Sequence, residues 1–127
     1  MKKLILILYL FIPLLFYCQE NVEYEFNKIN FFAPATQFSN AINKTSFTKS
    51  KTTVFFNENT ISILVFYPDE IINSKYNIEK VNDKGDYYSF VCLAENSSTV
   101  FIDIQKNGNW IKRTVKHNGI IHKFYNN

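Results

Sequence analysis

The sequence contains few of the residues that cross-link small domains or bind metals. Cysteine and histidine each occur only twice, and Cys18 ends an N-terminal apolar run. The remainder of the chain keeps only Cys92, and a lone thiol cannot form an internal disulfide. Zinc needs three or four converging ligands, and His117 and His122, with a turn expected between them, are not predicted to share a face. These absences predict a domain without disulfides, metal or cofactor, held together by its hydrophobic core.

Motifs for covalent catalysis are also missing. There is no Gly-x-Ser-x-Gly elbow. Cys92 stands between apolar neighbours, where a thiol is expected to be buried, with a raised pKa and little reactivity. A carboxylate pair for glycoside hydrolysis would meet only in the fold, and Asp103 is expected on the solvent side of its strand together with Gln105. The sequence therefore predicts no catalytic residue and a non-enzymatic protein.

One segment gathers oxygen ligands around a glycine, as calcium loops do. In Asn82–Asp86, Asp83 and Asp86 flank Gly85. The segment lacks the regular alternation of ligands and the distal glutamate of the calcium loop. A turn in which Gly85 takes a positive φ explains the same residues, so a turn without metal is predicted.

The N-terminus has the pattern of a secretory signal peptide. Two lysines precede an apolar run from Leu4 to Tyr17, which is shorter than the roughly 20 residues of a membrane-spanning helix. The predicted signal peptide spans residues 1–18, and cleavage after Cys18 leaves Gln19 at the mature N-terminus. An uncleaved N-terminal anchor is the alternative, whereas the mature chain is predicted to lack a membrane span.

Cys18 has a second interpretation, as the lipidated cysteine of a bacterial lipoprotein. Lipobox sequences carry small residues just before that cysteine, whereas Tyr17 is bulky, so ordinary cleavage is favoured over lipid anchoring. The segment resembles the signal peptides of secreted proteins of Bacteroidota, which often end in a small residue followed by glutamine. The resemblance covers about the first nineteen residues and implies a secreted or periplasmic protein, without implying an activity.

The charge balance gives little reason to expect a polyanionic partner. Removal of residues 1–18 takes away two lysines and no acid, so the formal net charge falls from +3 to +1. A nearly neutral chain is not predicted to bind nucleic acid. Lysines give the C-terminal part a basic character, and Trp110 and Tyr125 carry rings that stack on sugars or bases. Solubility, core packing and strand pairing explain these residues equally well.

The C-terminal part predicts an antiparallel meander. Four segments are rich in aromatic and β-branched residues and are bounded by Asn, Gly or Ser, as strands are. They are Tyr87–Ala94, Thr99–Gln105, Trp110–Val115 and Ile120–Tyr125. The second segment alternates with period two, which places Val100, Ile102 and Ile104 on the expected core face. Local reversals without an intervening helical pattern pair neighbouring strands.

Two Asn-Gly pairs punctuate this meander. Asn107 and Gly108 separate the second and third segments, and Asn118 and Gly119 separate the third and fourth. Asn-Gly tolerates the positive φ values of a type I′ turn, so two tight hairpins of that type are predicted.

A further hairpin is predicted in the middle of the chain. Thr52–Phe56 and Thr60–Tyr67 are strand-like and flank the polar segment Asn57–Asn59. The second strand has apolar residues on both sides, which indicates a central strand covered on both faces. Asn77–Val81 is expected to form another short strand before the Gly85 turn.

Residues 19–51 are the least informative part of the sequence. Val22–Phe26 alternates as a short first strand does, and the apolar patch Asn30–Ala35 is interrupted by proline. Thr36–Asn43 is expected to form one or two helical turns with Thr36 as N-cap, and Asn43–Lys51 is expected to be a solvated loop or the lead-in to a strand.

The sequence therefore predicts an all-β antiparallel meander of seven or eight strands, forming a small barrel or a two-layer sandwich. Its expected organisation is a signal peptide (1–18), a lead-in segment (19–51) and the meander (52–127), the last two in one domain. The first functional hypothesis is a barrel that binds a small apolar ligand and resembles lipocalin-like proteins in strand order, without their motifs. The alternative is an extracellular or cell-surface module with a filled core that binds another protein. An enzyme or enzyme inhibitor would need a concave cluster of acids or histidines.

Overall fold

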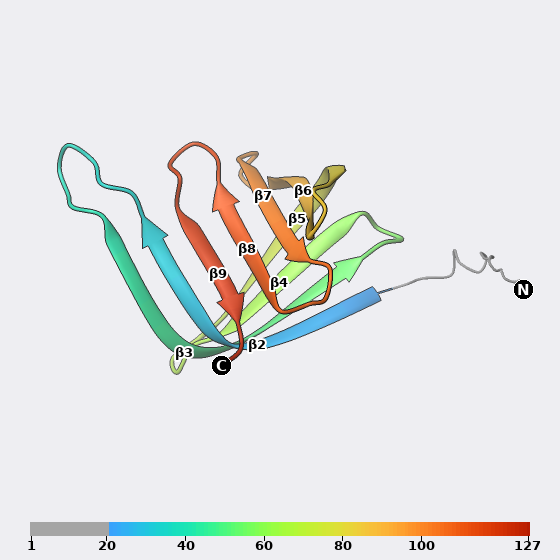
Figure 1. Ribbon diagram of the computed structural model, residues 1–127, viewed down its shortest axis with the longest axis horizontal. Coiled ribbons are helices and arrows are strands. Elements are labelled where there is room, and N and C mark those ends of the chain that lie inside the picture. The colour runs from blue at the N-terminus through green and yellow to red at the C-terminus, as the bar shows by residue number, and fades with distance from the viewer. Residues whose placement is uncertain (1–20) are drawn as a thin grey trace, which may run out of the picture.

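Eight β-strands run through residues 21–127, the part of the chain that the computed structural model describes (Figure 1). They are β2 (Asn21–Ala33), β3 (Ile42–Phe55), β4 (Thr60–Phe66), β5 (Ile71–Asp83), β6 (Tyr87–Ala94), β7 (Thr99–Gln105), β8 (Trp110–Val115) and β9 (Ile121–Tyr125). This part of the chain contains no helix, and therefore none long and apolar enough to cross a membrane. The predicted processing site at Cys18 and Gln19 lies outside the described residues.

The strands form a closed antiparallel meander. Each strand pairs with the next along the chain, and β9 pairs with β2, from Lys28 opposite Tyr125 to Phe32 opposite Ile121. The predicted all-β meander is thus confirmed, with eight strands closed into a barrel. Residues 21–51, which the sequence left without a clear structure, contribute β2 and most of β3.

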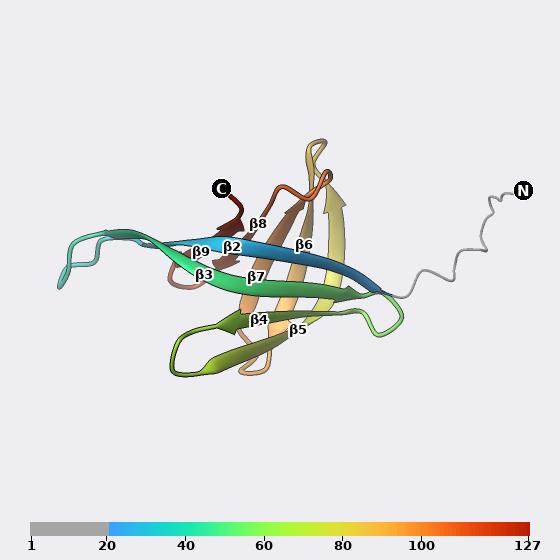
Figure 2. The ribbon, with the colours of Figure 1, turned by 90° about the horizontal axis from the view of Figure 1, so that it is seen from below.

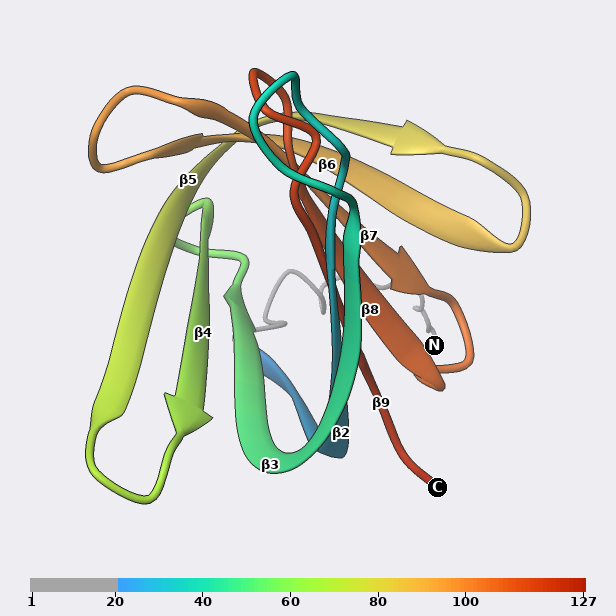
Figure 3. The ribbon, with the colours of Figure 1, turned by 90° about the vertical axis from the view of Figure 1, so that its left-hand side faces the viewer.

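Two long strands, β2 and β5, bend and change pairing partners along their length. The first half of β2, Asn21–Phe26, pairs with β3, whereas Lys28–Phe32 also pairs with β9 across an irregularity between Phe26 and Lys28. β5 likewise pairs with β4 through its first half and with β6 through its second, with a shift between Ile78 and Lys80. Bulges of this kind bend and twist a strand. Figure 3 shows the result, in which β4 and the first part of β5 lie across from β6 and β7.

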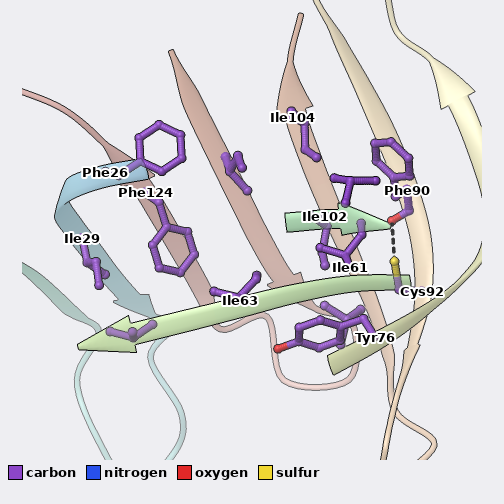
Figure 4. Close-up of a cluster of buried hydrophobic side chains, with 14 residues drawn as sticks. Phe26, Ile29, Ile61, Ile63, Tyr76, Phe90, Cys92, Ile102, Ile104 and Phe124 are labelled. Atoms are coloured by element: carbon purple, nitrogen blue, oxygen red, sulfur yellow. Dashed lines mark hydrogen bonds between the residues drawn. The ribbon is translucent and has the colours of Figure 1, made fainter. Parts of the chain in front are cut away.

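The inward-facing side chains of the strands meet in one hydrophobic core (Figure 4). As predicted from the period-two pattern, Val100, Ile102 and Ile104 are buried, with exposed fractions of 3% or less. The largest fully buried apolar side chains come from β3, β4, β7, β8 and β9 and are Phe124, Ile61, Ile63, Ile102, Ile111 and Val54. An eight-stranded barrel is just wide enough for such side chains to fill it. The middle of this barrel is therefore filled, and the hollows lie at its two ends.

The C-terminal hairpins match the predicted strands but not the predicted turn type. β6, β7 and β8 have the predicted bounds, and β9 begins one residue later than expected. Gly108 and Gly119 have positive φ values of 78° and 71°, but Asn107 and Asn118 do not have positive φ. A type I′ turn needs positive φ at both central residues, so that prediction was wrong. The Gly108 N–H instead donates to the Gln105 carbonyl at 2.9 Å, which closes a wider loop with glycine at its end.

The β2–β3 hairpin corrects the predicted helix at Thr36–Asn43. Thr36 Oγ1 accepts hydrogen bonds from the N–H groups of Phe38 and Ser39, each at 3.1 Å, as an N-cap does, but the chain turns back into β3 instead of continuing as a helix. We call the outer part of this hairpin, Lys28–Thr48, the arm. Figure 2 shows the arm extending beyond the rest of the barrel.

Two predictions of burial were wrong, one because the barrel has a single layer of strands and the other because neighbouring strands cover a side chain on the outer face. The outer face of β4 is not covered, since Leu64 is only half-buried and Phe66 is 36% exposed. Asp103 was expected to be solvent-exposed on the outer face of β7. It does face outward, opposite Ser89 on β6 and Lys112 on β8, but only 9% of it is exposed.

Candidate functional site at the ends of the barrel

One end of the barrel opens into a hollow of about 380 Å³ with apolar walls, which we call the apolar mouth. Its lining comes from β2, β3, β5, β6, β7 and the β3–β4 turn and consists of Val22, Tyr24, Val54, Phe56, Val81, Tyr88, Phe90 and Ile104. Val54, Phe90 and Ile104 are buried and form the floor, whereas Phe56, Val81 and Tyr88 are 40–51% exposed. The lining contains no charged side chain, and burial raises the pKa of Tyr24. The hollow can hold an uncharged apolar group.

The rim of the apolar mouth is held by a polar contact between the end of β5 and the β7–β8 turn. Lys106, in the β7–β8 turn, donates to Asp83 Oδ1 at 2.8 Å and lies 4.7 Å from the ring centroid of Tyr88. Asp83 Oδ1 also accepts the Gly85 N–H at 2.9 Å. The hydrogen bond from Lys106, followed by that from Gly85, lowers the pKa of Asp83. This contact joins the end of β5 to the β7–β8 turn beside Tyr88.

The opposite end of the barrel opens into a hollow of about 460 Å³ with mixed walls, which we call the polar mouth. The inner face of the arm supplies most of its lining, together with β9 and the β4–β5 turn. The residues are Ile29, Phe31, Ile42, Lys44, Ser46, Thr48, Tyr67 and His122. Apolar side chains therefore alternate with hydrogen-bonding groups and one ammonium group, and the two ends of the barrel differ in chemistry.

His122 is the titratable group with the largest perturbation in the polar mouth. Burial, and then the positive charge of Arg113, lowers its pKa to about 4. The ring packs between Phe31 and Phe124, with centroid distances of 5.1 Å and 6.4 Å, and its buried Nδ1 atom has no hydrogen-bond partner among residues 21–127. His122 is therefore neutral at physiological pH and cannot attract an anion by charge.

Arg113 points inward from β8, next to His122. It donates a hydrogen bond of 2.8 Å to the Tyr76 hydroxyl and lies 5.9 Å and 5.7 Å from the rings of Tyr76 and Phe124. Within the described part of the chain, no carboxylate forms an ion pair with it. Aromatic faces and one hydroxyl stabilise the guanidinium group here.

The residues considered for chemistry in the sequence do not come together. His117 lies exposed in the β8–β9 turn, while His122 lies inside the barrel. Cys92 is fully buried, and burial, then the charge of Glu79, raises its pKa to about 12. Asp83 is engaged by Lys106. No group of three or more His, Cys, Asp or Glu side chains close enough to hold a metal exists among residues 21–127.

Sequence reasoning missed both mouths. Val81 and Tyr88 belong to predicted strands, but their partly exposed positions beside a shared hollow depend on the bend of β5 and the closure of the barrel. The sequence carries only a weak indication of the mouths, which is that apolar side chains persist at the ends of strands, where polar residues usually begin.

The fold and these hollows define a small closed β-barrel with a filled middle and two different open ends. Comparison with known proteins adds no family to this description. No protein-family model matches the chain, and no curated protein has a significantly similar sequence.

Proposed function

We propose that this protein is a non-enzymatic binding protein that holds a small apolar molecule in the apolar mouth. The observation that carries the proposal is the uniform lining of that hollow, which exposes Phe56, Val81 and Tyr88 above an apolar floor. Exposed apolar side chains gathered around a concavity mark binding sites. The volume lies at the lower end of the range of about 300–1,000 Å³ typical of ligand pockets, which favours a small ligand.

The proposal adapts the lipocalin-like hypothesis to a filled barrel. The closed eight-stranded meander is consistent with a lipocalin-like fold, but Ile61, Ile63 and Ile111 occupy the middle where a deep ligand would lie. We therefore place the ligand at the end of the barrel rather than in its axis. Export from a bacterial cell, which the N-terminal pattern predicts, is part of the proposal and would expose the protein to apolar molecules outside the cytoplasm.

Titration with an uncharged apolar fluorophore, N-phenyl-naphthylamine, tests this function. The protein should bind the dye with increased emission, and Val81→Ser should weaken binding by about three- to tenfold because it replaces apolar wall with a hydroxyl. Ile71→Ser is the matched control, since Ile71 lies on the same strand and is 61% exposed but does not line the apolar mouth. Equal binding by both variants would contradict the proposal.

The filled middle of the barrel favours a second candidate function, recognition of another protein through the surface. A barrel without an axial cavity is a rigid support for exposed elements, and the arm carries Phe38 and Phe47 at exposed fractions of 88% and 73%. This candidate concerns the opposite end of the molecule from the apolar mouth, so the two functions can be tested separately.

A further inference from the structure

Part of one edge of β3 pairs with no other strand among residues 21–127. β4 pairs with β3 only from Lys49 opposite Phe66 to Phe55 opposite Thr60, so Ile42–Phe47 pairs with β2 alone and Thr48 pairs with neither strand. Such an edge presents a row of backbone N–H and C=O groups that can accept a further strand. Figure 2 shows this part of β3 extending past the β4–β5 turn.

The polar mouth lies beside this open edge. Ile42, Lys44 and Ser46 alternate on the face of β3 that lines the hollow, and Tyr67 from the β4–β5 turn lines it as well. Successive side chains of a strand point to opposite faces. A strand added next to β3 would therefore direct every second side chain towards this hollow, where Ile29, Phe31 and Tyr67 provide apolar contact.

The charge of the arm limits the kind of strand that fits. The sequence from Phe26 to Asn57 contains lysines but no aspartate or glutamate. Lys51 is paired with Glu23 at 3.3 Å, whereas the other lysines, Lys28, Lys44 and Lys49, form no ion pair among residues 21–127. Lys44 lies on the open edge itself and faces the hollow. A complementary strand would carry acidic residues.

A second copy of this chain is a poorer occupant of the edge. Two arms paired edge to edge along Ile42–Thr48 would bring Lys44 of one copy close to Lys44 of the other. Like charges on neighbouring strands destabilise the pairing, and lysine on an edge strand is a common protection against self-association. An acidic partner reverses the sign of this interaction.

We propose that the arm binds an extended acidic segment of a partner protein, which adds as a strand along Ile42–Thr48. Backbone hydrogen bonds to β3 supply affinity, an apolar side chain enters the polar mouth, and a carboxylate pairs with Lys44. This is the division of roles that strand addition uses elsewhere, with the main chain for affinity and pockets for alternate side chains for specificity.

Hydrogen exchange measured by NMR tests this proposal. The probe is a capped peptide of alternating valine and glutamate, about six residues long, which is a typical strand length. Binding should slow exchange at about three or four alternate amides within Ile42–Thr48, because alternate residues direct their N–H groups to the same edge. The same peptide with alternate backbone nitrogens methylated should not bind, and nor should the version with lysine in place of glutamate.

Charge reversal tests whether Lys44 itself pairs with the peptide or whether any lysine attracts it equally. Lys44→Glu should weaken peptide binding by about three- to tenfold, since an attractive cross-strand pair becomes repulsive. Lys84→Glu is the matched control in the β5–β6 turn and should bind the peptide as the wild type does. Both lysines are exposed, so neither change removes a core contact.

Three outcomes would overturn the inference: peptide binding without slowed exchange at Ile42–Thr48, equal loss in both lysine variants, or protection of these amides in a dimer without peptide. The result is independent of the apolar mouth, because Val81→Ser should leave peptide binding unchanged. Failure of this proposal and failure of the proposed function are therefore distinguishable.

Discussion

Several polar side chains point into this barrel without a polar partner. Ser50 and Thr52 on β3 are fully buried, and their hydroxyls have no hydrogen-bond partner among residues 21–127. An unpaired buried hydroxyl costs about 1–3 kcal/mol. Ser50 lies two residues after Thr48, which lines the polar mouth, so the polar inner groups extend from that mouth towards the filled middle. The two ends of the barrel thus differ inside as well as at their openings.

His122 makes the stability of the protein sensitive to acid. Its pKa falls from 6.5 to about 4 on folding, so the unfolded chain binds this proton more tightly. The stabilisation is present above pH 6.5 and is lost as the pH falls towards 4. Because the ring is partly accessible, we expect the wild type to lose about 1–2 kcal/mol through this residue at about pH 4.5.

Urea unfolding of the wild type and His122→Gln at neutral pH and at about pH 4.5 measures this effect. The variant cannot take up the proton, so its free energy of unfolding should fall less between the two conditions. Carboxylates titrate in both proteins and cancel in the comparison. An identical fall in both proteins would show that His122 is not the group responsible.

The β7–β8 turn connects the fold to the apolar mouth. Gly108 has a φ of 78°, and a Cβ added there would lie 3.4 Å from the Tyr24 ring. Gly108→Ala should lower the free energy of unfolding by about 1–2 kcal/mol through backbone strain, because the added Cβ makes only an ordinary contact with that ring. Urea unfolding measures the loss. Gly85→Ala is the control for strain alone, because its φ is also positive but no atom lies within 4 Å of the added Cβ. A Gly108→Ala protein as stable as the wild type would contradict this description of the turn.

The strands were predictable where an alternating β-rich run is bounded at both ends by strong turn signals. β6, β7 and β8 were found from the sequence because β-rich runs end at Asn, Gly or Ser. The arm was not, because Asn43–Thr48, which is polar except for Phe47, lacks a buried face, and Thr36 has a capping side chain that suits a helix as well as a turn. This segment is a strand because it pairs with β2, and the local sequence does not indicate that pairing.

The candidate sites were less predictable than the strands. Val22, Val81 and Tyr88 are distant in the sequence and meet only because β2 and β5 bend and the barrel closes. The burial of Asp103 likewise depends on the side chains of the neighbouring strands β6 and β8. Local alternation identifies which side of a strand faces inward, but not which end of the barrel opens.

At the scale of the whole molecule, closure of the meander separates the two proposed binding surfaces. The filled middle, with Phe124 and Ile111 fully buried, lies between the apolar mouth and the polar mouth. An apolar molecule and an extended peptide would therefore occupy opposite ends without competing. Binding at one end should leave affinity at the other unchanged, unless the barrel itself deforms.

Methyl NMR with N-phenyl-naphthylamine tests the central claim most directly, because it reports where an apolar ligand lies. Valine and isoleucine methyl groups occur both in the apolar mouth, at Val22, Val54, Val81 and Ile104, and in the filled middle, at Ile63 and Ile111. We predict that the dye shifts the resonances of the first group and leaves those of the second unchanged. Shifts centred on Ile63 and Ile111 would place the ligand inside the barrel and contradict the filled middle, and a dye that perturbs neither group would contradict the proposed function.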